Sequence, residues 1–212
     1  MKLYTYYRSS ASCRVRIALN LKQIKYEHIC IDLKNAAHQA DEFAAINPQQ
    51  FVPVLQADDT VITQSLSIIH YLETQYPEPS VYGGDALETA RIQSAAQIIA
   101  CDIHPLDNLR VLNYLKHHLR HDQDAVDDWY RHWVVQGLQV LEQLVRPDNA
   151  NAPFCFGNRP SLADICLAPQ MYNARRFAVD LSPYPRLCGI DEQLLSLPAF
   201  ADAMPDKQPD AP

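Results

Sequence analysis

The N-terminal segment combines a short strand pattern, a serine cluster and the start of an amphipathic helix within about twenty residues. The pattern predicts a strand over Lys2–Tyr6 and a helix over Ala11–Leu21. Ser9, Ser10 and Ser12 fall where the first N–H groups of that helix are unpaired and its dipole is positive. A strand that runs into a polar helix N-terminus indicates an α/β unit with an anion site at this junction.

A simpler interpretation is an ordinary helix cap, because serine is a preferred capping residue. Three arginines, Arg8, Arg14 and Arg16, bracket the serines and favour a thiolate or carboxylate site over a simple cap. Arg14 and Arg16 lie inside the helix. For both we therefore expect a structural or dimer-interface salt bridge rather than a catalytic role.

The bulk composition limits the class of protein. The chain has 212 residues, enough for one large or two modest domains, and 48% of them are hydrophobic. The net charge is −7 and the isoelectric point is about 5.5. A nucleic-acid-binding protein carries a basic footprint, so this acidic chain is not expected to bind nucleic acid.

The six cysteines form no C-x-x-C pair, which argues against a zinc knuckle or a dithiol redox motif. Their scattered spacing is typical of reduced thiols in a reducing compartment. The N-terminus lacks an apolar signal region, and no apolar run approaches the length of a membrane span. We therefore expect a cytoplasmic protein with no membrane role.

Strand and helix signals alternate over the first 80 residues. They predict a β-α-β-α-β-β-α order, which matches a thioredoxin-like domain. After the strand and helix given above, the further elements are predicted at Tyr26–Asp32, Ala40–Ile46, Val52–Leu55, Thr60–Ile62 and Leu66–Tyr76.

A linker at about 77–86, rich in proline and glycine, separates this domain from an all-helical region over 87–212. Pro105 is expected to kink or interrupt the helix that begins at Leu87. Ser161 and Asp164 have the form of a capping box that opens a helix. Long helices are predicted at Leu87–Cys101, Leu106–Leu119, Ala125–Arg146, Ser161–Phe177 and Leu187–Leu195, followed by a loosely held tail over 205–212. The fold class is thus α+β, with a thioredoxin-like domain followed by an all-α domain.

Several motifs along the chain resemble zeta-class glutathione transferases. The serine stretch Tyr7–Leu19, the pair Val52-Pro53, which resembles that family's cis-proline loop, and the pair Gln64-Ser65 carry the resemblance in the first domain. The stretches at 102–108 and 174–181 carry it in the second, and the match spans nearly the whole chain. One position departs from the pattern, because Ala11 stands where the family usually has a cysteine.

The resemblance implies a glutathione-dependent cis–trans isomerase that converts maleylacetoacetate to fumarylacetoacetate in aromatic amino acid catabolism. Glutathione thiolate adds to the double bond of a dicarboxylate, the resulting single bond rotates, and the thiolate leaves. Two alternatives remain open, namely isomerisation of maleylpyruvate and a broad glutathione transferase acting on small halo acids. The resemblance also implies a homodimer with a small dicarboxylate substrate and no metal.

The resemblance assigns candidate residues to this chemistry. Ser9 or Ser10 is expected to stabilise the thiolate, while Arg8 and Arg176, with Arg110, are expected to hold the substrate carboxylates. Glutathione is implied to lie against Ser9, Ser10, Ala11, Ser12, Cys13, Arg14, His38, Val52, Gln64, Ser65, His104, Asn108, Leu109 and Arg110.

Helical geometry bears on the candidates of the second domain. Arg175 and Arg176 point about 100° apart on a helix, so at most one of them faces a given site. His104 and Asn108 are four residues apart and share a face of a regular helix, whereas Arg110 falls nearly opposite Asn108.

For the remaining candidates we prefer a structural role over a functional one. Cys13 is one turn inside its helix and is expected to be a packing residue. His117 and His121 are expected to form a solvated helix end rather than a metal site. Trp129 and Trp133 are expected in the core.

Overall fold

The computed structural model describes residues 1–145 and 152–212. The chain divides into two compact units. The first, here the N-terminal unit, comprises residues 1–80 and 197–212; the second, here the helical unit, comprises residues 81–196.

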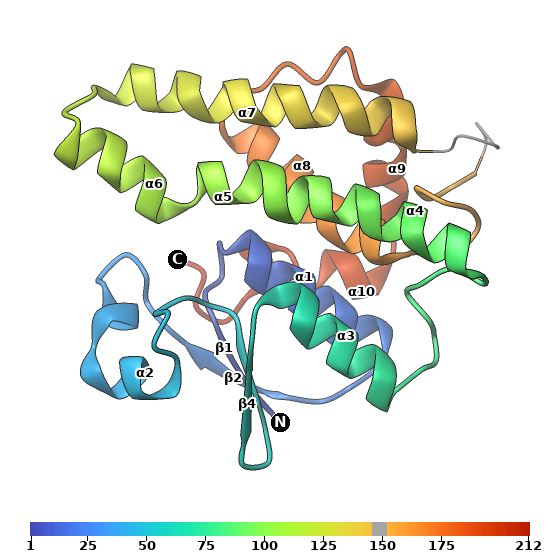
Figure 1. Ribbon diagram of the computed structural model, residues 1–212, viewed down its shortest axis with the longest axis horizontal. Coiled ribbons are helices and arrows are strands. Elements are labelled where there is room, and N and C mark those ends of the chain that lie inside the picture. Colours follow the sequence, from blue (N-terminus) through green and yellow to red (C-terminus); the bar gives the residue numbers. More distant parts are fainter. Residues whose placement is uncertain (146–151) are drawn as a thin grey trace. The chain divides into compact units, whose positions relative to one another are not determined.

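The N-terminal unit is built on a four-stranded sheet in the order β2-β1-β3-β4 (Figure 1). The strands are β1 (Lys2–Thr5), β2 (Glu27–Cys30), β3 (Val54–Ala57) and β4 (Thr60–Thr63). β1 pairs parallel with β2 and antiparallel with β3, so that Leu3 lies opposite both His28 and Leu55. The sheet places the end of β1 beside the end of β2, which matters for the site described below.

Two helices, α1 (Ser10–Leu21) and α3 (Ser65–Gln75), run next to each other in this unit (Figure 1). The apolar side of α1 is fully buried through Val15, Ala18 and Leu19, as the helical spacing predicts. A 3-10 turn (Ala37–Gln39) and α2 (Asp41–Ile46) follow β2. The β-α-β-α-β-β-α order and the thioredoxin-like fold class are therefore confirmed, with ends shifted by one or two residues.

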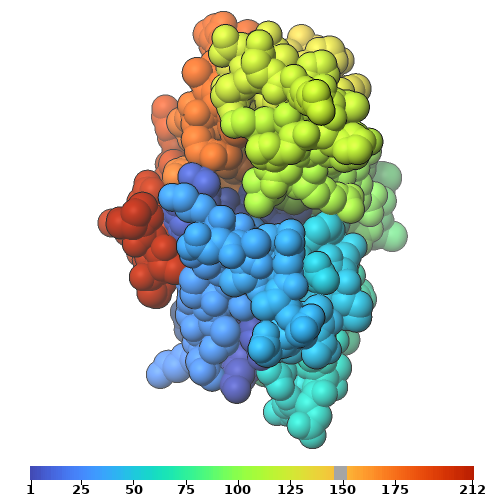
Figure 2. All heavy atoms as spheres, turned by 90° about the vertical axis from the view of Figure 1, so that its left-hand side faces the viewer, coloured from blue at the N-terminus to red at the C-terminus, as the bar shows by residue number. Residues whose placement is uncertain are grey.

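The C-terminal segment 197–212 belongs to the N-terminal unit, although the sequence analysis assigned it to the helical domain. Its short helix α10 (Pro198–Ala201) packs on α1, and a 3-10 turn (Pro205–Lys207) follows. Figure 2 shows this segment, in red, lying against the blue N-terminal residues. The expectation of a loose tail is wrong, because Gln208 is buried and donates to the carbonyl oxygens of Asp202 and Met204 at 2.8 and 2.9 Å.

The described residues of the helical unit form two long helices and several shorter ones. Its α-helices are α4 (Ala86–Gln97), α5 (His104–Asp107), α6 (Leu109–Asn113), α7 (Gln123–Leu144), α8 (Leu162–Arg176) and α9 (Pro185–Leu195). Two π-helical segments, Ile98–Ile103 and Tyr114–His118, follow α4 and α6. The predicted end of α7 at Arg146 lies outside the described residues.

The helix expected to cross Pro105 is interrupted at this point. It widens into a π-helix over Ile98–Ile103, restarts as α5 and stops at Asn108, whose backbone is extended. Proline has no N–H to donate and its ring crowds the preceding turn, which explains a disruption here. The side chain of Asn108 then caps α6 by accepting from Val111 N at 3.3 Å.

The buried side of α7 differs from the one predicted. Val126, Tyr130, Val134, Leu138 and Leu141 are buried, whereas the sequence analysis placed Trp129 and Trp133 on the core stripe. Both tryptophans are only partly buried. The predicted and the observed buried stripes are offset by one residue along the helix. Helical spacing alone distinguishes such neighbouring stripes poorly.

The capping box that opens α8 is confirmed. Asp164 is fully buried and accepts hydrogen bonds from Ser161 N at 2.8 Å and from Cys155 N at 2.9 Å. None of the six cysteines forms a disulfide. Within the described ranges, no helix combines the length and apolar character that crossing a membrane requires.

Candidate active site

The serine cluster forms the N-terminus of α1. Ser9 is the N-cap, and its hydroxyl oxygen accepts from Ser12 N at 3.2 Å. Ser9 N donates to the carbonyl oxygen of Tyr6 at 3.0 Å and so closes a tight turn after β1. A hydroxyl that accepts through a lone pair still has its proton to donate. Ser9 can therefore cap the helix and hydrogen-bond an anion at the same time.

Ser10 and Ser12 are both buried, and Ala11 is partly buried. The Ser12 hydroxyl oxygen is shielded from solvent and lacks a hydrogen-bond partner among the described residues. Buried hydroxyls usually have partners, so this one has unused hydrogen-bonding capacity at the helix start.

Cys13 is not at the surface of this junction. It is fully buried, and its thiol donates to the carbonyl oxygen of Ala203 at 3.3 Å. Burial raises the pKa of the Cys13 thiol, so it is not an accessible nucleophile. Its prediction as a packing residue is confirmed, and its full burial argues against a place among the glutathione contacts.

Arg14 is only 2% exposed and points toward the start of α3. Its Nη1 donates to the Ser65 hydroxyl at 3.3 Å. The other two guanidinium nitrogens, Nε and Nη2, are buried without a partner in the part of the chain that the structure describes. A buried charge without full pairing is costly, so this arrangement favours an anion near Ser65.

Arg16 has a structural role, but not through the salt bridge that we expected. Its guanidinium donates to the carbonyl oxygens of Tyr6, Tyr7 and Ala203 and to the Thr5 hydroxyl, at 2.9 to 3.3 Å. All of these acceptors are uncharged. Arg16 therefore joins the turn after β1 to the C-terminal segment.

Gln64 and Ser65 lie where β4 passes into α3. Gln64 has a φ of 67° and ψ of 120°, a region that non-glycine residues rarely occupy, and its amide donates to Gln49 Oε1 at 2.8 Å. Ser65 is buried at the first helical position. Uncommon backbone of this kind persists where the surroundings enforce it, often beside a ligand site.

Two further candidates belong to this unit. The Val52-Pro53 peptide bond is cis, as the resemblance implies. His38 lies in the 3-10 turn before α2, where burial lowers its pKa and leaves its Nδ1 without a partner among the residues described.

In the helical unit, Arg176 belongs to an aromatic cluster. Its guanidinium carbon lies 4.4 Å from the centre of the Phe177 ring, which stacks on Tyr130 with ring centres 3.5 Å apart. The Tyr130 hydroxyl is hydrogen-bonded to the Arg176 side chain. By contrast, Arg175 forms an ion pair with buried Asp191 on α9. The two arginines thus point to different surroundings, as their spacing requires.

Asp107, the last residue of α5, adds an unexpected carboxyl group to this cluster. It is 7% exposed, and neither carboxyl oxygen has a hydrogen-bond partner within the described ranges. Burial raises its pKa from 3.8 to about 8. The Asp107 charge also contributes to raising the pKa of Tyr130. At neutral pH this carboxyl is mostly protonated.

His104 and Asn108 do not share a helix face, contrary to the prediction from their spacing. α5 ends at Asp107, and Asn108 is extended and caps the next helix. Leu109 and Arg110 form the exposed first turn of α6. The break also removes the objection that Arg110 must lie opposite Asn108, because that objection assumed a regular helix.

No group of three or more metal-binding side chains is found in residues 1–145 and 152–212. His117 and His121 are both exposed.

Tyr130 and Asp107 are functional candidates that were not predicted from the sequence. Tyr130 is four residues from both Val126 and Val134, so a stripe at that spacing could have revealed it. Asp107 carries no such signal, because its burial depends on how α5 packs on α7.

The chain was compared with known proteins. Residues 3–80 match the family model "Glutathione S-transferase, N-terminal domain". A maleylacetoacetate isomerase of Pseudomonas aeruginosa is 45% identical, with 100% of this chain and 99% of the relative covered. A maleylpyruvate isomerase of a Ralstonia species is 43% identical, with both chains covered completely.

Solved structures of similar fold support the same family. A holo maleylpyruvate isomerase, a bacterial zeta-class glutathione transferase, superimposes with a TM-score of 0.98 at 43% identity and full coverage of both chains. A maleylacetoacetate isomerase of Methylobacterium extorquens, solved with malonate and glutathione, gives 0.96 at 38% identity, again with full coverage. The chain belongs to the glutathione S-transferase family, in its zeta class. Within that class, these similar proteins are named maleylacetoacetate isomerase and maleylpyruvate isomerase.

Proposed function

We propose that this protein is a glutathione-dependent cis–trans isomerase that converts maleylacetoacetate to fumarylacetoacetate. The observation that carries the proposal is the 45% identity, over the whole chain, to a maleylacetoacetate isomerase. The reaction belongs to the breakdown of tyrosine and phenylalanine. We further propose that the enzyme works in the cytoplasm as a homodimer.

The residues of the N-terminal unit fit an anionic tripeptide such as glutathione. Both α1 and α3 begin with a serine-rich turn, and helix N-termini attract negative charge. The buried charge of Arg14 has unused donors next to Ser65. An anion held at Ser65 would offset part of the cost of that charge.

When bound, glutathione supplies a thiolate that adds reversibly to the substrate double bond and so permits rotation. We assign to Ser9 or Ser10 the hydrogen bond that stabilises this thiolate, aided by the dipole of α1. Because Ala11 has no thiol, the loop works with hydroxyl and backbone N–H donors. We assign the cysteinyl main chain to Val52, the γ-glutamyl end to Gln64 and Ser65, and the glycyl end to His38.

Arginines are the groups that we propose for the substrate carboxylates and for the negative charge that develops during addition. Arg8 lies within the turn after β1, with its guanidinium carbon 5.6 Å from the centre of the Tyr7 ring. Arg176 is oriented by Tyr130 and Phe177. We propose that Arg110 contributes from α6, together with His104, Asn108 and Leu109 near the glutathione.

Maleylpyruvate, an intermediate of gentisate degradation, is the second candidate substrate. Its support is the identity of 43% over complete chains to the Ralstonia enzyme, close to the value for the first candidate. A broad transferase activity on small halo acids would use the same arginines, because these recognise any small carboxylate.

The deciding experiment compares maleylacetoacetate, maleylpyruvate and dichloroacetate with and without glutathione. Loss of the cis-enone absorbance reports isomerisation, and released chloride reports the transferase reaction. We expect the highest kcat/KM with maleylacetoacetate and dependence on glutathione. A higher value with maleylpyruvate would select the alternative. No glutathione-dependent turnover of any substrate, together with no glutathione binding, would leave only a binding or dimerisation module.

A further inference from the structure

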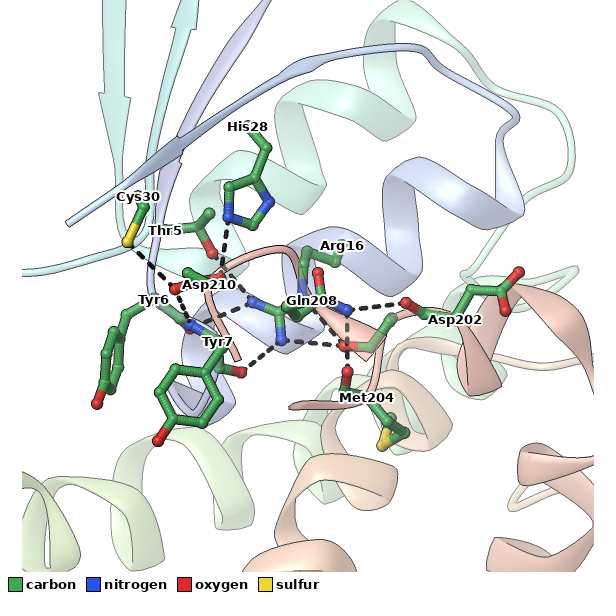
Figure 3. A network of polar contacts seen from close by, with 11 residues as sticks. Thr5, Tyr6, Tyr7, Arg16, His28, Cys30, Asp202, Met204, Gln208 and Asp210 are labelled. Carbon is green, nitrogen blue, oxygen red and sulfur yellow. Dashed lines mark hydrogen bonds and ion pairs between the residues drawn. The ribbon is translucent and has the colours of Figure 1, made fainter. Parts of the chain in front are cut away.

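Asp210, near the end of the chain, contacts the first and second strands. Its Oδ2 accepts the Tyr7 N–H at 2.8 Å and lies 3.3 Å from Cys30 Sγ, which donates to it. Its Oδ1 lies 3.2 Å from His28 Nε2. The Asp210 side chain is only 9% exposed. Figure 3 shows the three donors converging on this one carboxylate.

The contact with Tyr7 falls just beyond the end of β1. The parallel ladder with β2 ends where Ile31 N donates to the carbonyl oxygen of Thr5 at 2.8 Å. Past that point the sheet offers Tyr7 N–H no partner, and Asp210 takes this place. A hydrogen bond from a backbone N–H to a carboxylate is charge-assisted and stronger than a neutral one.

The opposite side of the same turn is held by Arg16. Its Nη1 donates to the carbonyl oxygen of Tyr6 at 3.3 Å and its Nη2 to that of Tyr7 at 2.9 Å (Figure 3). The same guanidinium donates to the carbonyl oxygen of Ala203, within the C-terminal segment. The turn is thus fixed through both its N–H and its carbonyl groups.

The C-terminal segment is held by hydrogen bonds of its own. Gln208 donates to two carbonyl oxygens within the segment, those of Asp202 and Met204, and so bends the chain back on itself. This bend brings Asp210 to the sheet. The carboxylate is therefore presented by an ordered support rather than by a freely moving tail.

Two residues of the proposed site follow directly after Tyr7. Arg8 lies over the Tyr7 ring, and Ser9 N bonds back to the carbonyl oxygen of Tyr6. A displacement of the Tyr7 peptide would therefore move both side chains. Displacements of about 1 Å at a catalytic centre can cost on the order of 100-fold in rate.

We propose that Asp210 is a positioning residue for the reaction: by holding the Tyr7 peptide it sets Arg8 and Ser9 in their working positions. The C-terminal segment is then a structural part of the site, although none of its residues need touch glutathione. This inference rests on the proposed function, since it concerns the same thiolate and carboxylate contacts.

Two substitutions test it. Asp210→Ala removes the acceptor for Tyr7, and Asp210→Asn keeps a neutral acceptor while removing the charge. Asp202→Asn is the control, because the Asp202 side chain is exposed and only its backbone carbonyl contacts Gln208. The measurements are the pKa of bound glutathione, from thiolate absorbance against pH, and the separate values of kcat and KM.

We expect Asp210→Ala to raise the pKa of the bound thiol and to lower kcat/KM by about 10- to 100-fold, with Asp210→Asn intermediate. Hydrogen exchange of the peptide that contains Tyr7 should become faster in both variants. The control should match the wild type. A merely structural contribution would lower the melting temperature and leave the thiol pKa unchanged, which would overturn the proposal.

Folding failure of Asp210→Ala would not leave the question open, because Asp210→Asn then decides it. Unchanged Tyr7 exchange and an unchanged thiol pKa in that variant would contradict the proposal. Failure of the proposed function is a different outcome: the wild-type protein itself would then show no glutathione-dependent turnover.

Discussion

Arg14 of α1 donates a hydrogen bond to the hydroxyl of Ser65, the first residue of α3, at 3.3 Å. This contact connects the helix that begins at the serine cluster with the helix that we propose for the γ-glutamyl end. Arg14 is almost completely buried and retains two unpaired nitrogens among the residues described. The burial of this charge is therefore better explained by the binding of an anionic ligand than by a contribution to the stability of the fold.

Arg14→Met should have opposite effects on stability and on ligand binding. Removing an incompletely paired buried charge relieves a desolvation cost, so the melting temperature without glutathione should stay the same or rise. Glutathione affinity should fall by about 10- to 100-fold, the worth of hydrogen bonds to a charged group. Calorimetric titration and thermal unfolding measure the two effects. Wild-type affinity in the variant would assign Arg14 a purely structural role.

Arg8→Ala and Arg176→Ala should weaken the use of the dicarboxylate more than the binding of glutathione. Losing one charged hydrogen-bonding group should reduce kcat/KM by about 10- to 100-fold. Arg159→Ala is a suitable control, because Arg159 is an exposed arginine of the same unit as Arg176. Equal losses in substrate use and glutathione binding, or losses in neither, would mean that the roles of Arg8 and Arg176 are misassigned.

Asp107→Asn should change how stability depends on pH. The folded pKa of Asp107 is about 8 against an ordinary 3.8, so between these values the folded state holds a proton that the unfolded state has released. Stability from this group is therefore present at low pH and is lost as pH rises toward 8. The variant should gain stability relative to wild type by up to about 1.4 kcal/mol per pH unit across this window.

Urea unfolding of wild type and Asp107→Asn at several pH values measures this difference. The two curves should converge at the acid end and separate toward pH 8. A constant difference at all pH values would show that the Asp107 carboxyl titrates normally.

Cys13 should resist alkylation in the folded protein, because it is buried and its thiol pKa is raised. Cys101, which is exposed, should react with iodoacetamide first. Cys30 is also exposed, but burial of its thiol and the hydrogen bond to Asp210 raise its pKa to about 11, so Cys30 should react more slowly than Cys101. Peptide mass spectrometry after brief labelling distinguishes them. Cys13→Ala should bind glutathione within about twofold of wild type while losing some stability to the small cavity. Rapid labelling of Cys13, blocked by glutathione, would instead return it to the site.

Much of the N-terminal unit could be predicted because its signals are local. A strand, a serine cluster and a helix follow each other between residues 2 and 21, and each is specified by spacing and capping within a few residues. The capping box at Ser161 was predictable for the same reason. The helix through Pro105 was less so, because proline indicates a disruption without specifying where the helix stops.

Three features that differ from the predictions have the same physical cause. The burial of Cys13, the uncharged partners of Arg16 and the ordered tail all depend on the C-terminal segment packing on α1 and β1. No pattern near residue 16 indicates that its partner will be Ala203. Contacts between residues almost two hundred positions apart are set by the packed fold.

The sequence by itself determined the alternation of strands and helices, the serine-rich helix start and the family of the chain. These properties depend on periodicity, capping and residue identity, which are local. Only the tertiary structure decided that Arg14 is buried against Ser65, that the Asp107 carboxyl is shielded from solvent, and that Asp210 accepts a hydrogen bond from the Tyr7 peptide. Hydrogen-bond partners and desolvation follow from which distant segments meet, and that is set when the apolar faces pack together.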